Sequence, residues 1–299
     1  MAVGLALDAV IGDPHRGHPV AAFGVAASRL EQTMWRDSRA WGAAYCATCV
    51  VLPVALGVSV ARLPARTVLA ALSTWAVVGG TTLGREALGI GQALEAGDLD
   101  EARRRLPALV GRDPSGLSTD EVARAVVESV AENTSDAVVA PLFWGALLGV
   151  PGLLGYRAVN TLDAMVGHHS ERYERFGWAS ARLDDVAGWV PARLTGWLTV
   201  LLAPTVGGTR GTAARVLVGD GGHHPSPNAG RCEAAFAGAL DVTLGGRNDN
   251  GGRVEDRPLM GEGTPVSVAD ISRAVHLSTL VGRASGVLDV LVLLRRRRS

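Results

Sequence analysis

Long uncharged stretches alternate with strongly charged ones along this chain. Residues 40–61 carry no charged side chain, and a helix of about 20 apolar residues is long enough to cross the hydrocarbon core of a bilayer. Residues 67–84 form a second uncharged stretch, and the short segment 62–66 between the two contains Pro64. A short segment with a proline between two apolar stretches is typical of a tight helical hairpin. The pattern therefore predicts two antiparallel transmembrane helices.

A third uncharged stretch, residues 137–156, is interrupted. Pro141 and Pro151 break it, and Gly145 and Gly149 stand in a G-x-x-x-G relation. Such a segment can cross the bilayer, or it can dip into the bilayer and return where protein or water covers the freed backbone groups. The second alternative would bring the polar residues at its two ends to the same side, and we expect that side to be cytoplasmic.

Two further apolar stretches lie toward the C-terminus. Residues 194–209 are rich in Leu and Val, and residues 280–294 lead into four consecutive arginines that predict a cytoplasmic end. We expect an all-α, multi-pass integral protein of the cell membrane with polar helical loops, forming one membrane-embedded domain over residues 1–299.

Composition supports this interpretation and narrows the chemistry. Of the 299 residues, 47% are hydrophobic and 19% are charged, and the mean hydropathy is +0.21, which is apolar for a soluble enzyme of this length. The 29 basic residues balance 29 acidic ones, so no overall field attracts nucleic acid. The chain has no lysine, which excludes Schiff-base chemistry and a Walker A site. Arginines, backbone amides or a metal must hold any bound phosphate.

Charged segments separate the apolar ones. Residues 99–109 carry three adjacent arginines and are typical of a solvated surface helix. Residues 245–263 are rich in Gly, Asn and Arg, and they predict a flexible surface loop. Cys46 and Cys49 lie within an apolar run, where we expect them to pack as small hydrophobic residues.

Acidic residues recur every four positions on one predicted helix. Ser118 begins a capping box, and Glu128, Glu132 and Asp136 follow it. Three carboxylates on one face repel each other unless a divalent cation or arginines neutralise them. One interpretation is a solvated acidic face. The other is a Mg²⁺ site linked to phosphate.

A second polar cluster begins where the third apolar stretch ends. Arg157, Asn160 and Asp163 fall on or near one helical face. Further arginines and carboxylates follow soon after, at Arg172, Arg182, Asp184 and Asp185. Beside an apolar segment, this mixture indicates anion or metal-phosphate binding. The alternative is an internal network of salt bridges.

Two turns carry further candidates. Near the N-terminus, a turn displays Asp13 and His18, and each is followed by proline. After His223 and His224, the segment Ser226-Pro227-Asn228 leads toward a helix, so its side chains are either helix caps or part of a site. The two histidines lack the spacing of a zinc site.

Several motifs taken together resemble those of the CobD/CbiB membrane proteins of cobalamin biosynthesis. They occur in order through most of the chain: Gly12-Asp13-Pro14, His18-Pro19-Val20, Val110-Gly111-Arg112-Asp113, Val127-Glu128-Ser129-Val130-Ala131-Glu132-Asn133, Tyr156-Arg157-Ala158-Val159-Asn160-Thr161-Leu162-Asp163, Arg172-Tyr173, Ala181-Arg182-Leu183-Asp184-Asp185 and Ser226-Pro227-Asn228-Ala229-Gly230.

The resemblance implies adenosylcobinamide-phosphate synthase activity, which is ATP-dependent amide formation between adenosylcobyric acid and an amino-alcohol phosphate such as aminopropanol phosphate. The expected partners are these substrates, ATP and membrane lipid, with other cobalamin-biosynthesis enzymes as candidate associates. Three sets of residues are the expected site: Mg²⁺ ligands Glu128, Glu132, Asp136 and Asp163; substrate or phosphate ligands Arg112, Asn133, Arg157, Asn160, Arg172, Arg182, Ser226 and Asn228; and catalytic groups Asp13, His18, Asp184 and Asp185. The choice of general base stays open.

Two other functions fit parts of the pattern. Ionisable residues beside broken apolar segments also occur in transporters, so a corrinoid-binding or corrinoid-transporting protein is one alternative. A membrane phosphotransferase of the CDP-alcohol type would also use helical carboxylates and a metal, but its D-G-x-x-A-R motif is absent from the sequence.

Overall fold

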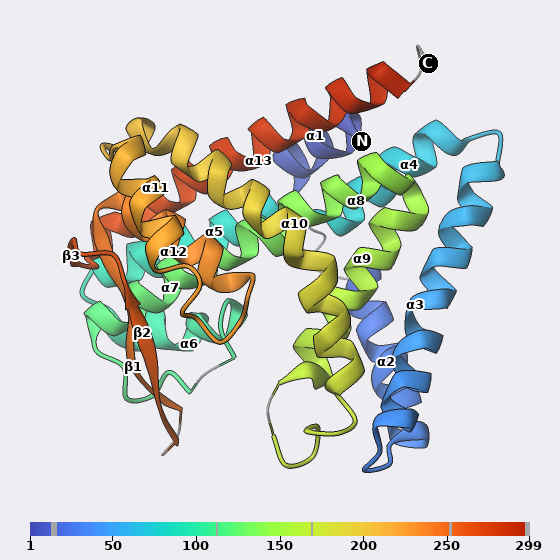
Figure 1. Cartoon of the computed structure of the whole chain (residues 1–299), viewed down its shortest axis with the longest axis horizontal. Coiled ribbons are helices and arrows are strands. Elements are labelled where there is room, and N and C mark those ends of the chain that lie inside the picture. Colours follow the sequence, from blue (N-terminus) through green and yellow to red (C-terminus); the bar gives the residue numbers. More distant parts are fainter. Residues whose placement is uncertain (13–16, 112, 169, 251–252, 297–299) are drawn as a thin grey trace. The chain divides into compact units, whose positions relative to one another are not determined.

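The protein is mostly helical, as predicted, and carries one small sheet (Figure 1). The computed structural model describes residues 1–12, 17–111, 113–168, 170–250 and 253–296. The chain divides into two compact units: Met1–Gly79, Asp136–Pro191 and Ser285–Ser299 form unit 1, and Gly80–Ser135 and Ala192–Ala284 form unit 2. The single membrane-embedded domain that we expected over residues 1–299 stays a prediction.

Unit 1 contains the N-terminal helices and the interrupted apolar segment. Its elements are α1 (Ala2–Ile11), α2 (Pro19–Met34), α3 (Arg39–Arg62), α4 (Arg66–Val77), the π-helical turn η2 (Ser135–Val139), α8 (Ala140–Leu148), α9 (Val150–Leu162), the π-helical turn η3 (Asp163–Gly167), and the adjoining parts of α10 (Trp178–Leu202) and α13 (Val268–Arg296).

The core of unit 1 forms where α2, α3 and α9 pack alongside one another (Figure 1). Tyr45 on α3 is fully buried, donates its hydroxyl to the Ala27 carbonyl and lies 5.1 Å from the Phe176 ring centroid. Cys46 and Cys49 are buried in the same cluster, which confirms their predicted role in packing. The 62–66 hairpin is also confirmed, because α3 ends at Arg62 and α4 begins at Arg66.

The third apolar stretch is not one straight helix. Gly149 separates α8 from α9 with a φ of 71° and a ψ of −151°, a conformation that glycine adopts without strain. Pro141 and Pro151 lie in the first turns of these two helices, where the missing N–H costs no hydrogen bond. At Gly152, α9 approaches the Trp144 carbonyl so closely that a Cβ would collide with it. The predicted break is therefore confirmed.

Unit 2 contains α5 (Gly80–Glu95), α6 (Leu99–Arg105), the 3₁₀ turn η1 (Leu106–Ala108), α7 (Thr119–Thr134), the 3₁₀ turn η4 (Ala203–Val206), α11 (Arg210–Gly219), α12 (Ala229–Leu240), and the remaining parts of α10 and α13. The capping box at Ser118 is present, since its hydroxyl accepts from the Glu121 N–H and the Glu121 carboxylate accepts from the Ser118 N–H.

The loop predicted over residues 245–263 is wrong. Strands β1 (Val242–Asn250) and β2 (Arg253–Met260) pair in an antiparallel hairpin, and β3 (Thr264–Pro265) pairs with β1 in parallel. The ladder is irregular between Leu244 and Gly246, and Gly245 and Gly246 take positive φ values of 86° and 90° there. The glycines thus allow a bulge within a strand, whereas their abundance had indicated a loop.

Four helices in the described part of the chain are long and apolar enough to cross a membrane. They are Arg39–Arg62, Arg66–Glu95, Trp178–Val206 and Val268–Arg296, with a mean hydropathy between 1.3 and 2.0. The second of these runs through α4 and α5 and contains the brief interruption after Val77. They include the four predicted stretches other than 137–156, so the expectation of a multi-pass helical membrane protein is confirmed in length and composition.

Candidate active site

Three polar side chains meet within unit 1. The Asn160 amide on α9 donates to Asp136 Oδ2 over 3.3 Å and to Asp184 Oδ1 on α10 over 3.5 Å. The Tyr156 hydroxyl, one turn earlier on α9, donates to Asp136 Oδ1 over 3.5 Å. We call Asp136, Asn160 and Asp184 the polar triad. It brings two carboxylates together across one amide.

The polar triad exists because the apolar segment folds back. Asp136 and Asn160 are separated by 24 positions in the chain, so one straight helix would place them about 36 Å apart. Their side chains are instead in hydrogen-bond range. The break at Gly149 thus brings both ends of the segment to one place, as the re-entrant alternative requires.

Arg157 extends the triad with a positive charge. Its Nη1 lies 3.5 Å from Asn160 Oδ1, while the amide nitrogen of Asn160 faces the two carboxylates. Asn160 therefore orients a cation on one side and two anions on the other. Such an arrangement can bind a phosphate together with its counter-ion.

Two more carboxylates lie near the triad in sequence. Burial raises the pKa of Asp163, at the start of η3, to about 6, and the like charge of Asp185 adds to the effect. Asp185 also pairs with Arg182 at 3.4 Å on the exposed surface of α10. Arg182 is therefore partnered within its own helix, and Asp163 holds its proton to a higher pH than an ordinary aspartate does.

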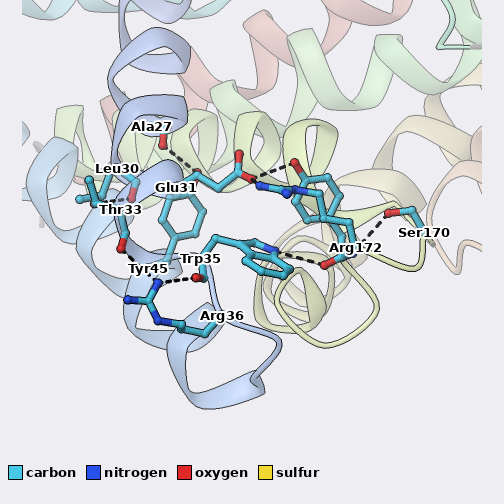
Figure 2. A network of polar contacts seen from close by, with 10 residues as sticks. Ala27, Leu30, Glu31, Thr33, Trp35, Arg36, Tyr45, Ser170 and Arg172 are labelled. Atoms are coloured by element: carbon cyan, nitrogen blue, oxygen red, sulfur yellow. Dashed lines mark hydrogen bonds and ion pairs between the residues drawn. The ribbon is translucent and has the colours of Figure 1, made fainter.

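Arg172 lies in a separate network, shown in Figure 2. Its Nη2 donates to the buried Glu31 carboxylate at the end of α2 over 2.9 Å, and the Tyr173 hydroxyl donates to the same oxygen over 2.9 Å. The Arg172 guanidinium also lies 4.7 Å from the Trp35 ring centroid, and Trp35 Nε1 donates to the Arg172 carbonyl. These contacts fasten the segment before α10 to α2. The described contacts of Arg172 are thus structural, and its predicted phosphate role stays a prediction.

The expected acidic face lies across a change of helix type. α7 ends at Thr134 and the π-helical turn η2 begins at Ser135, so Glu128 and Glu132 lie on α7 and Asp136 lies in η2. A shared metal role for these three carboxylates stays a prediction. In unit 2, Glu128 is buried and accepts from the Gly245 N–H over 2.9 Å. Glu128 therefore holds the β-bulge in place. Glu132 is half-buried on the same helix.

The remaining predicted residues of unit 2 have structural contacts. The Asn133 amide donates to the Ser129 carbonyl one turn back. Ser226 Oγ accepts from the Asn228 and Ala229 N–H groups at the start of α12, and Asn228 Oδ1 accepts from Arg193. The segment therefore leads into the helix as predicted, with Ser226 bonding the N–H groups at its start, while Asn228, the N-cap residue, makes no side-chain cap bond. The substrate role expected for these side chains stays a prediction.

The N-terminal candidates are only partly described. His18 is the N-cap of α2, and its Nδ1 accepts from the Val20 N–H over 3.2 Å. Asp13 and Arg112 lie outside the described residues. The cap accounts for the His-Pro pair structurally, because proline suits the first turn of a helix.

The donor set suits a cation that is carried by phosphate. In the described part of the chain, no group of three or more His, Cys, Asp or Glu side chains is placed to hold a metal ion. Mg²⁺ usually retains water and binds through one or two carboxylates plus substrate phosphates. Asp136 and Asp184 fit that requirement, and the predicted four-carboxylate set is not assembled within either unit.

Sequence reasoning missed several residues of unit 1. Tyr156 directly precedes Arg157 in a quoted motif, so its place one turn before Asn160 was available from helical spacing. Glu31 and Trp35 gave no comparable signal. Their partners are more than 130 positions away in the chain, and only the tertiary fold brings them together.

Comparison with known proteins decides the family. The family model described as CobD/Cbib protein matches residues 1–278. The chain belongs to the CobD/CbiB family. It is 51% identical to the cobalamin biosynthesis protein CobD of Mycobacterium tuberculosis, over 99% of this chain and 95% of the relative. It is 45% identical to the protein of the same name from Geobacter metallireducens, over 86% and 84% of the two chains.

Membership of the CobD/CbiB family supports a role in cobalamin biosynthesis. A third family member, the CobD protein of Rhodobacter capsulatus, is 40% identical over 93% of this chain and 91% of its own. No solved structure matches the chain.

Proposed function

We propose that this protein is a membrane-embedded ligase that forms an amide between adenosylcobyric acid and an amino-alcohol phosphate, using ATP. Family membership supports the pathway. The observation that carries the chemistry is the polar triad with Arg157, a group of opposite charges at the end of an apolar segment. Ionisable residues in such surroundings are costly and usually functional.

The reaction needs activation because a carboxylate has no usable leaving group. In the proposed first step, an oxygen of the propionate carboxylate attacks the γ-phosphorus of ATP, the bond to the bridging oxygen breaks, and ADP leaves. The product is an acyl phosphate. In the second step the amine attacks the acyl carbon, the C–O bond to phosphate breaks, and inorganic phosphate leaves. The amine nitrogen loses its extra protons to a base.

The side chains divide these tasks. Arg157 would bind phosphate oxygens, since a guanidinium donates two parallel hydrogen bonds. Asp136 and Asp184 would hold Mg²⁺, which neutralises phosphate charge when bound. Asn160 would keep the two carboxylates and Arg157 in their relative positions. The base is Asp185, Asp184 or His18 in this proposal, and it accepts a proton as the nitrogen attacks.

The location of ATP in the cell indicates which side of the membrane the proposed site faces. ATP is available in the cytoplasm, so the polar triad would open to that side of the cell membrane. Other cobalamin-biosynthesis enzymes are candidate neighbours there. Nucleic acid has no place in this reaction, and the balanced charge of the chain agrees with that.

Product analysis tests the proposal. Protein purified in detergent is given adenosylcobyric acid, aminopropanol phosphate, ATP and Mg²⁺, and we expect the amide by mass spectrometry, dependent on ATP. Asp184→Asn should lower turnover about 100-fold or more, as expected for displaced reacting groups. The matched control is Asp37→Asn, at an aspartate whose side chain is 59% exposed, and it should leave turnover unchanged.

The transport alternative predicts a different result. A transporter reconstituted in vesicles would accumulate unmodified corrinoid and form no amide. Unchanged adenosylcobyric acid in the detergent assay, in parallel with a CobD relative that converts it, would refute the ligase proposal.

A further inference from the structure

An apolar cavity lies within unit 1, beside the polar triad. It has a volume of about 520 Å³, is partly open to the surface, and is lined by side chains of α2, α3, α4 and α9. Its lining includes Phe23, Leu30, Leu56 and Ala158, and Arg157 is the one charged residue among the lining residues described. Cavities of this size hold small molecules or chains, and a cavity with such walls offers water too few hydrogen-bond partners.

The cavity lies at the middle of the most apolar candidate span. Its wall on α3 runs from Cys49 to Leu56, in the central turns of Arg39–Arg62. That span has a mean hydropathy of 2.0, and only 22% of its most apolar window is buried. Leu52 and Leu56 line the cavity and are also exposed on the surface. In a bilayer, exposed leucines at the middle of a span face hydrocarbon.

One end of the cavity leads toward a group of arginines and tryptophans. Leu30 lines the cavity, and Trp35 caps α2 five positions later, about 8 Å along the helix axis. Arg36 follows Trp35 and its guanidinium lies 5.6 Å from the Trp41 ring centroid. Figure 2 shows Leu30, Thr33 and Arg36 following one another at this end of α2, where Arg36 donates to the Thr33 carbonyl.

This end has the composition of a membrane interface. Arg39 begins α3 and Trp178 begins α10, and the Arg39 guanidinium lies 5.4 Å from the Trp178 ring centroid. Two candidate spans therefore start at the same level. Tryptophan rings favour the headgroup level of a bilayer, and arginines there attract anionic lipid. Within the described residues, no acidic side chain forms an ion pair with Arg36 or Arg39.

We infer that the cavity holds one acyl chain of an anionic phospholipid, whose phosphate binds at Arg36. The headgroup lies at the Trp35–Trp41 end of α2 and α3, and the acyl chain runs past Leu30 into the cavity. The lipid supplies the hydrocarbon that the walls require, and it closes the apolar side of Arg157. This inference does not depend on the proposed reaction.

Photo-crosslinking tests the inference. The full-length protein is placed in nanodiscs that contain phosphatidylglycerol with a diazirine in the middle of one acyl chain, and labelled peptides are mapped by mass spectrometry. Ala158 is 3% exposed and lines the cavity, so label on the α9 peptide around it arises from inside the cavity. We expect label there as well as on the exposed face of α3.

Two pairs of variants sharpen the test. Ala26→Phe adds a ring at a lining position and should remove the α9 label, whereas Ala22→Phe, on an exposed position of α2 outside the lining, should retain it. Arg36→Gln should weaken labelling by phosphatidylglycerol roughly fivefold, the effect of one arginine near an anionic surface. The control Arg29→Gln, also exposed on α2, should not. Size-exclusion chromatography identifies any variant that does not fold. In that case, labelling of the wild-type protein by phosphatidylglycerol and by phosphatidylcholine still tests the inference.

Three results would overturn the inference. The first is label confined to the outer face of α3 in the wild-type protein. The second is equal labelling by diazirine-bearing phosphatidylglycerol and phosphatidylcholine, which would remove the role of Arg36. The third is loss of the α9 label on addition of adenosylcobyric acid, which would assign the cavity to substrate.

Discussion

Replacement of Asp163 by asparagine should stabilise this protein at neutral pH. The carboxyl group is half-buried at the start of η3, and this loss of solvation, with the like charge of Asp185, raises its pKa from 3.8 to about 6. At about 1.4 kcal/mol for each pKa unit, ionised Asp163 therefore costs the folded state up to about 3 kcal/mol. Asparagine has the same shape and no charge, so Asp163→Asn removes this cost.

The sign of the effect fixes its pH dependence. Between pH 3.8 and about 6 the folded protein binds a proton at Asp163 that the unfolded chain has released, so the free energy of unfolding falls as pH rises. The loss is complete above the folded pKa. The variant should therefore exceed the wild type most at pH 8, and about half of that advantage should have disappeared at pH 5.

Thermal unfolding in detergent measures this difference. The midpoints of wild type and Asp163→Asn are compared from pH 5 to pH 8 in EDTA, because a bound divalent cation would itself favour the ionised carboxyl. Asp37→Asn, at an exposed aspartate, serves as the control and should show no such trend. Equal midpoints at pH 8, or an advantage that shrinks as pH rises, would refute the assigned burial of Asp163.

Other predictions concern the triad and the topology. Asn160→Leu should lower turnover about 100-fold, because it removes the amide between two carboxylates, and kinetics like those of the wild type would exclude a positioning role. Arg157→Lys should also be poorly tolerated, since an ammonium cannot form a bidentate fork; kcat and KM for both phosphate substrates measure this. Single cysteines at the exposed Ser115 and Glu174, with the three native cysteines replaced, should react with an impermeant reagent only from the cytoplasmic face, and labelling in intact cells would contradict the common orientation.

The local features of the fold were predictable from sequence. The hairpin at residues 62–66, the capping box at Ser118 and the break in the third apolar stretch all follow from proline, glycine and cap residues at fixed spacings. The hairpin at residues 242–260 was not predictable in this way. Its glycines belong to a bulge whose Gly245 N–H is bonded by Glu128, a partner from a distant helix.

The candidate site shows the same division. Arg157 and Asn160 were found from helical spacing, and their approach to each other is confirmed. The π-helical turn that contains Asp136 was missed, because such a turn leaves no clear mark in the sequence. The partner of Arg172 in the fold, Glu31, lies 141 positions earlier and could not be identified without the structure. The phosphate role of Arg172 stays a prediction.

The route of oxygen from the carboxylate tests the proposed ligase chemistry most directly. Adenosylcobyric acid labelled with ¹⁸O in its free carboxylate is converted with ATP and aminopropanol phosphate, and the inorganic phosphate is analysed by mass spectrometry. Activation as an acyl phosphate predicts one ¹⁸O atom in phosphate for each amide formed. Amide formation with unlabelled phosphate, or with the label in AMP, would contradict the proposed chemistry.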